Sequence, residues 1–171
     1  MTLHVFIVDA SVLVAGLISS QPASPVIRVV DAMLQGRLLY LLSPGLLSEY
    51  RAVLLRPKLI CRHGLDEEQI DRLLTELTAN AVWRDPLSDT GLPAHDPGDD
   101  HLWALLATEP GACLVKGDRL LVKNPRPGSR VITASEWVAG LEYPLTRVWH
   151  ETRVINPVCH RRCGSAGLPA R

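Results

Sequence analysis

Residues 4–11 read His-Val-Phe-Ile-Val-Asp-Ala-Ser, and this stretch decides the fold class. The four consecutive apolar residues are all β-branched or aromatic, which is typical of a buried strand, and Asp9 ends the run. The apolar residues from Ser11 to Ile18 then predict a helix. A buried strand followed directly by a helix is typical of folds in which parallel strands alternate with helices.

The alternation of strands and helices continues to about residue 141. Further strands are expected at 38–42, 82–84, 112–116 and 131–133. Helices are expected at 26–35, from 44 to the residues before Pro57, at 65–81, from 97 through 106, and at 135–141. The pairs Ser43-Pro44 and Asp96-Pro97 are typical helix starts, with an N-cap residue before a proline. These elements predict a three-layer α/β/α sandwich with a mostly parallel central sheet.

Composition excludes several classes of protein. The chain has 171 residues, of which 47% are hydrophobic and 21% charged, as expected for one globular domain rather than a disordered chain. The longest apolar run, Val5 to Ile18, contains Asp9 and is shorter than the roughly 20 residues of a membrane helix. No basic, cleavable leader is evident at residues 1–4, so we expect a cytoplasmic protein with no membrane association.

The charge is unevenly distributed, although 18 basic residues balance 18 acidic ones. Residues 1–144 carry a net charge of −4, and residues 145–171 carry +4. We therefore expect one domain at 1–141, followed by a basic and partly flexible extension at 142–171. Cys159, His160 and Cys163, with His150, allow a zinc interpretation, but their spacing departs from the usual structural zinc patterns, and free thiols are the alternative.

Acidic residues from four separate segments carry the functional signal. In an open parallel sheet, ligands bind at the carboxyl ends of the strands, so these acids are expected to converge there. Closely spaced carboxylates resist joint ionisation, and a hard divalent cation relieves the repulsion. The predicted chemistry is hydrolysis of a phosphodiester assisted by Mg²⁺ or Mn²⁺. The candidate ligands are Asp9, Glu49, Asp99, Asp100 and Asp118.

Each acid also has a purely structural interpretation. Asp9 and Asp118 are plausible turn or capping residues, and Glu49 a solvated helix residue. Asp99 and Asp100 suit the first turn of a helix, where the helix dipole favours anions. Asp96 is expected to be a structural N-cap rather than a ligand. The joint placement of the acids, rather than any single one, indicates function.

The segments that carry a family resemblance are Val5–Ser11, Ser43–Tyr50, Arg56–Leu59, Asp96–Ala107, Leu114–Asp118 and Leu120–Leu121. Through them the chain resembles the PIN-domain ribonucleases, in particular the VapC-like toxins of toxin–antitoxin modules. The resemblance covers residues 4 to about 141, with order and spacing preserved.

The resemblance implies a metal-dependent endoribonuclease that takes RNA as substrate. Asp9, Glu49, Asp100 and Asp118 match the family's four acidic catalytic positions, and Asp99 is a further candidate metal ligand. Asp100 is preferred over Asp99 because Ala107 lies seven residues after it, as in the family's helix. A cognate antitoxin protein and a homodimer are the partners that the family implies.

One position departs from the family. Lys116 stands where these ribonucleases usually have Thr or Ser, directly before Gly117-Asp118. A lysine there is expected either to contact the scissile phosphate or to pair with a carboxylate and weaken metal binding. Other cations near the expected site, which are either phosphate contacts or solvated surface charges, are Arg56, Lys58, Arg119 and Lys123.

Two alternative functions stay open. The first is a catalytically weak PIN-like module that binds RNA or an antitoxin without cutting, which Lys116 favours. The second is a phosphohydrolase that uses Asp9 as an aspartyl-phosphate nucleophile. Against the second, Ser11 stands where a second acid is wanted, and Glu49 has no role in that chemistry.

Overall fold

The computed structural model describes residues 4–86, 100–117 and 129–142. The strands are β1 (Phe6–Val8), β2 (Leu41–Leu42), β3 (Val82–Trp83), β4 (Cys113–Val115) and β5 (Arg130–Ile132). The helices are α1 (Ala10–Ile18), α2 (Pro25–Leu34), α3 (Pro44–Leu54), α4 (Pro57–His63), α5 (Glu67–Asn80), α6 (Asp100–Thr108) and α8 (Ala134–Glu142). The expected strands and helices that fall within these ranges are all confirmed, with shifts of a few residues at their ends.

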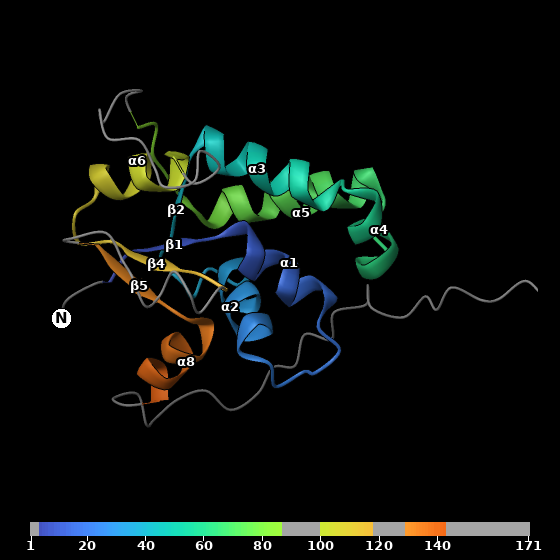
Figure 1. Cartoon of the computed structure of the whole chain (residues 1–171), viewed down its shortest axis with the longest axis horizontal. Helices are drawn as coiled ribbons and strands as arrows, with labels where there is room; N and C mark the ends of the chain where they lie inside the picture. The colour runs from blue at the N-terminus through green and yellow to red at the C-terminus, as the bar shows by residue number, and fades with distance from the viewer. Residues whose placement is uncertain (1–3, 87–99, 118–128, 143–171) are drawn as a thin grey trace, which may run out of the picture.

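All strand pairs in these ranges are parallel. β1 pairs with β4 and β4 with β5, while β2 pairs with β3. A bridge between Phe6 and Tyr40 joins the two groups, so that the strand order is β3-β2-β1-β4-β5. Helices α3, α5 and α6 lie on one side of the strands, and α2 and α8 lie on the other (Figure 1). The predicted α/β fold with a parallel sheet and flanking helices is confirmed.

Side-chain caps explain why two of the helices begin where they do. The Ser43 hydroxyl accepts from the Leu46 amide, and Pro44 takes the first helical position of α3, as the sequence predicts. Asp66 caps α5 through a capping box with Gln69. The first turn of α5 therefore holds Glu67 and Glu68, with Asp66 just before it.

Helix α4 is the element that the sequence analysis missed, because seven residues are too few to show a helical period. It ends at Gly64, whose φ of 70° is a left-handed conformation that glycine adopts without strain. The preceding residue, His63, is buried. Its Nε2 donates to the Leu54 carbonyl oxygen at 3.1 Å, and its Nδ1 accepts from the Leu65 amide at 3.1 Å. One imidazole ring thus fixes the corner between α3, α4 and α5.

Helices α1 and α2 cross closely at a glycine. A Cβ atom added to Gly16 would lie 2.5 Å from Cγ2 of Val30 and 3.0 Å from the Val26 carbonyl oxygen. No side chain larger than hydrogen fits at this position without movement of α2. The close crossing packs α2 against the C-terminal half of α1, the helix that begins after Asp9.

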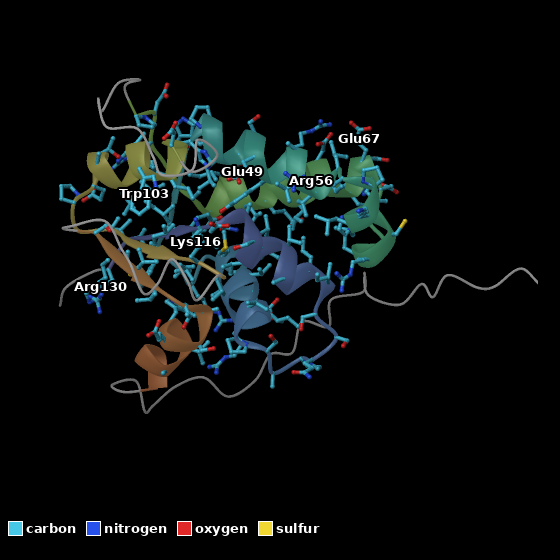
Figure 2. The ribbon with its side chains drawn as sticks, viewed as in Figure 1. Glu49, Arg56, Glu67, Trp103, Lys116 and Arg130 are labelled. Atoms are coloured by element: carbon cyan, nitrogen blue, oxygen red, sulfur yellow. The ribbon has the colours of Figure 1, made fainter. Side chains whose placement is uncertain are left out.

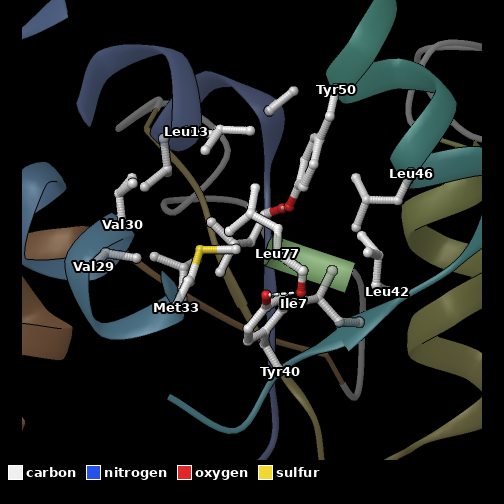
Figure 3. Packing of buried hydrophobic residues seen from close by; sticks show 14 of the residues in the cluster. Ile7, Leu13, Val29, Val30, Met33, Tyr40, Leu42, Leu46, Tyr50 and Leu77 are labelled. Carbon is white, nitrogen blue, oxygen red and sulfur yellow. Dashed lines mark hydrogen bonds between the residues drawn. The ribbon is translucent and has the colours of Figure 1, made fainter. Parts of the chain in front are cut away.

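The hydrophobic core contains two fully buried tyrosines (Figure 3). The Tyr40 hydroxyl donates to the Leu77 carbonyl oxygen, and the Tyr50 hydroxyl donates to the Val8 carbonyl oxygen. A buried hydroxyl without such a partner would cost free energy, so both bonds fix the position of the ring that carries them. Burial raises the pKa of both phenols, which stay protonated.

No helix within the described ranges is long and apolar enough to cross a membrane. Several predictions concern residues outside these ranges and stay predictions, among them the helix start at Asp96-Pro97, the basic extension predicted at 142–171, and the metal-binding potential of Cys159, His160 and Cys163.

Candidate active site

Asp9 and Lys116 occupy equivalent positions on neighbouring strands. Val8 of β1 is paired in register with Val115 of β4, and each strand ends at that residue. The Asp9 amide donates to the Val115 carbonyl oxygen at 3.0 Å, which continues the ladder by one bond. The residues that follow the two strands therefore meet at the carboxyl edge of the sheet, where open parallel sheets bind their ligands.

The Asp9 carboxylate is buried, with 6% of the residue exposed, and both of its oxygens have a neighbour. Oδ1 accepts from the Ser11 amide at 2.7 Å, so Asp9 is the N-cap of α1. Oδ2 lies 3.4 Å from the Lys116 ammonium nitrogen. The capping role weighed from the sequence is thus confirmed, and it uses one of the two oxygens.

The Lys116 side chain is as deeply buried as the Asp9 side chain with which it pairs. The side chains of Lys116 and Asp9 are 8% and 9% exposed. Removing a charge from water is costly unless an opposite charge compensates for it, so each of these side chains stabilises the charge of the other. Of the two expected roles for Lys116, pairing with a carboxylate is the one that the structure displays. Figure 2 shows the lysine near the centre of the molecule, where the strands end.

Ser11 links the same two strand ends, and the sequence analysis did not give it this role. The Gly117 amide donates to the Ser11 hydroxyl oxygen at 3.3 Å. A Cβ at Gly117 would lie 3.0 Å from that oxygen, so a larger residue would push the serine away. The sequence signal that could have revealed this contact is Ser11, two residues after Asp9, together with Gly117, which closely follows the predicted strand at 112–116.

Glu49 projects from α3 toward α6. Its Oε2 lies 2.8 Å from Nε2 of His101, and the two side chains are 31% and 22% exposed. Gly45, one turn earlier on the same face of α3, allows this approach, because a Cβ there would come within 3.2 Å of the His101 Cβ. His101 was not a candidate in the sequence, where a single histidine carries no signal without knowledge of its neighbour.

Tyr50 connects Glu49 with Asp9. It follows Glu49 on α3, and its hydroxyl donates to the carbonyl oxygen of Val8, the residue before Asp9. Burial raises the Tyr50 pKa most, and the charges of Asp9, Tyr40 and Glu49 raise it further. The carboxylates of Asp9 and Glu49 therefore lie within electrostatic range of one phenol, although they come from different elements.

Three of the five expected acids fall within the described residues. Asp9 follows the residue that Tyr50 contacts, Glu49 precedes Tyr50 on α3, and Asp100 is an exposed residue in the first turn of α6, next to His101. Asp99 and Asp118 lie outside the described ranges. The oxygen donors suit Mg²⁺ or Mn²⁺ chemically. Within residues 4–86, 100–117 and 129–142, no three acids, histidines or cysteines lie together as a group that could hold a metal ion.

Arg56 and Lys58 lie at the start of α4, after the end of α3. Arg56 is the N-cap residue of α4, Lys58 lies in its first turn, and both are exposed. Their expected role as phosphate contacts stays a prediction. Arg119 and Lys123, the other cations expected at this edge, lie outside the described ranges.

The described residues thus form a parallel α/β fold with Asp9 and Lys116 at the carboxyl edge of its sheet. The PIN-domain family model matches residues 5–120, a segment that contains Asp9, Glu49, Asp100 and Asp118. The chain belongs to the PIN-domain family, whose members are typically nucleases. No curated protein matches the chain at a significant level.

Proposed function

We propose that the chain is an endoribonuclease that hydrolyses RNA phosphodiester bonds with Mg²⁺ or Mn²⁺ as cofactor. The observation that carries the proposal is the hydrogen bond from the Tyr50 hydroxyl to the Val8 carbonyl oxygen, which joins the helix that carries Glu49 to the strand that ends at Asp9, in a chain of the PIN-domain family. Asp100 and Asp118 complete the proposed catalytic set, and Asp99 is the additional candidate ligand. A toxin role, with a cognate antitoxin and a homodimeric state, is the finer form of the same proposal.

The proposed reaction is an in-line displacement at phosphorus. A water oxygen forms a bond to phosphorus, the bond to the 3′-oxygen breaks, and that oxygen takes up a proton, which leaves 5′-phosphate and 3′-hydroxyl ends. A bound divalent metal would supply charge neutralisation at the phosphate and acidify a water. The chain's own contribution is to hold the acids: the Ser11 amide orients Asp9, His101 orients Glu49, and the Tyr50 hydroxyl fixes α3 against β1.

The first experiment is cleavage of a mixed RNA pool by the purified chain in Mn²⁺ or Mg²⁺, compared with EDTA. Glu49→Gln removes a partly exposed carboxylate and is expected to abolish cutting without unfolding the protein. Asp9→Asn and Asp118→Asn are expected to abolish cutting as well. Asp71→Asn, an exposed aspartate on α5, is the matched control and should cut like the wild type.

Metal-dependent cutting that is lost in the three site variants and kept in Asp71→Asn supports the nuclease. Equal cutting by Glu49→Gln, Asp9→Asn and the wild type would exclude these acids from catalysis. No cutting in either metal would favour the second candidate, a PIN-like module that binds RNA or an antitoxin without cleaving. The Lys116–Asp9 ion pair is the observation that favours that candidate.

A further inference from the structure

Lys116 is the charged group at the candidate site that the proposed reaction does not use. Its amide donates to the Ile132 carbonyl oxygen at 3.0 Å, so its main chain is fixed between β4 and β5. Its side chain is 8% exposed and extends toward Asp9, where the ammonium lies 3.4 Å from Oδ2. A buried cation therefore already stands beside the carboxylate that is expected to bind a metal.

The two carboxylate oxygens of Asp9 have different partners. The Ser11 amide occupies Oδ1 as part of the α1 cap, while Oδ2 faces the ammonium. A divalent cation on Oδ2 would be brought against the positive charge of Lys116 in a poorly solvated environment, where like charges repel strongly. A divalent metal would therefore compete with the Lys116 ammonium for Oδ2 of Asp9.

We propose that Lys116 is the resident cation of this site, which neutralises Asp9 in the metal-free protein and must be displaced before a divalent metal binds. The inference rests on the proposed function, because it concerns the metal expected at the same carboxylate. The flexible four-carbon stem of lysine lets the ammonium move while the main chain stays in the sheet. The consequence is a metal affinity well below that of the same acids without the lysine.

The test is Mn²⁺ binding by isothermal titration calorimetry, without RNA. Lys116→Gln keeps much of the side-chain length and removes the charge, and Lys116→Met is a second neutral variant of similar volume. Both are expected to bind Mn²⁺ at least about tenfold more tightly than the wild type, since a charge at this distance shifts ionic equilibria by about that factor or more. Adding Asp9→Asn to either variant should remove the gain.

Two charge controls accompany the neutral variants. Lys116→Arg keeps the positive charge and is expected to bind Mn²⁺ as weakly as the wild type. Arg72→Gln removes a positive charge from the exposed surface of α5, where Arg72 pairs with Glu68, and should leave Mn²⁺ affinity unchanged. Circular dichroism melts confirm that each protein is folded, and either neutral variant suffices if the other does not fold.

Unchanged or weaker Mn²⁺ binding in a folded neutral variant overturns the inference, and so does the absence of Mn²⁺ binding in all variants. A gain of the same size in Lys116→Arg also overturns it, because side-chain shape would then be the cause. RNA cleavage is scored separately. Tighter Mn²⁺ binding by the neutral variants without RNA cleavage supports the inference about Lys116 and contradicts the proposed nuclease. RNA cleavage with the same Mn²⁺ affinity in the wild type and the neutral variants supports the nuclease and contradicts the inference about Lys116.

Discussion

The Tyr50 hydroxyl donates to the main-chain carbonyl oxygen of Val8, and this bond joins the helix that carries Glu49 to the strand that ends at Asp9. Both ends of the bond lie one residue from an acid of the candidate site. The distance between the two acids therefore depends on a contact that involves neither carboxylate.

Tyr50→Phe removes this bond while keeping the ring. We expect the free energy of unfolding to fall by about 1–2 kcal/mol, since a buried carbonyl oxygen loses a donor. Tyr40→Phe removes the matching bond to Leu77 and is the control, with a similar loss of stability. Urea denaturation gives the stabilities, and RNA cleavage should fall more in Tyr50→Phe than in Tyr40→Phe. Equal cleavage by both variants would mean that Tyr50 has no positioning role.

Asp9 and Lys116 should be energetically coupled. Asp9→Asn deprives Lys116 of its buried counter-ion at 3.4 Å and is expected to cost about 3 kcal/mol of stability, and Lys116→Gln should also destabilise. The double variant removes both charges and should be more stable than the sum of the two losses predicts, by at least about 1 kcal/mol. Urea denaturation of the four proteins measures this coupling. Strictly additive losses would show that the pair contributes no mutual stabilisation.

Two helical glycines should respond in opposite ways to alanine. Gly140→Ala on α8 meets open space and is expected to stabilise by about 0.5–1 kcal/mol through helix propensity. Gly16→Ala forces a methyl group against Val30, and we expect overpacking to outweigh the propensity gain, with a net loss of about 1–2 kcal/mol. Thermal melts compare the two variants. A stabilised Gly16→Ala would mean that α1 and α2 separate easily.

The two cysteines within the described ranges should differ in reactivity. Cys61 is exposed on α4, whereas Cys113 is buried in β4, where burial raises the pKa of its thiol. Because the thiolate is the reactive form, a raised pKa and poor access both slow alkylation of Cys113 at neutral pH. Iodoacetamide labelling of the native protein, followed by peptide mapping, should modify Cys61 first. Labelling of both at the same rate would contradict the buried position of β4.

The surface pair of Arg51 and Asp71 should give acid-dependent stability. Hydrogen bonding to Arg51 holds the Asp71 pKa below its usual range in the folded protein. The stabilisation is therefore present above the unfolded pKa of about 4 and is lost as the pH falls. The urea midpoint of Asp71→Asn should lie below that of the wild type near pH 6, and the two should converge in acid. A constant difference across this range would contradict the assignment.

Local signals explain what the sequence predicted well. The apolar run before Asp9 is typical of a buried strand, whichever strand it pairs with. Ser43-Pro44 begins a helix because the Ser43 hydroxyl accepts a hydrogen bond from the Leu46 amide, three residues later in the same segment. The family match confirms the fold that the family resemblance implied. The prediction that Asp9 lies at the carboxyl edge of the sheet follows from the end of its strand alone.

Contacts between distant segments explain what was missed or left open. The sequence left Lys116 with two possible roles because its choice depends on the register of β1 against β4, which places it beside Asp9. His101 reaches Glu49 because Gly45 lets α6 approach α3. The Lys116–Asp9 contact and the His101–Glu49 contact each join two distant segments, and neither leaves a periodic pattern within one segment. Only the folded structure therefore shows them.

The strand order leaves β3 and β5 at the two edges of the described sheet, with two and three residues respectively. Such short edges offer little backbone for another chain to extend the sheet, which protects the protein from aggregation through strand pairing. The homodimer and the antitoxin complex proposed for this chain would therefore form through side chains on helical faces. The short edge strands thus restrict the kind of interface that either proposed complex can use.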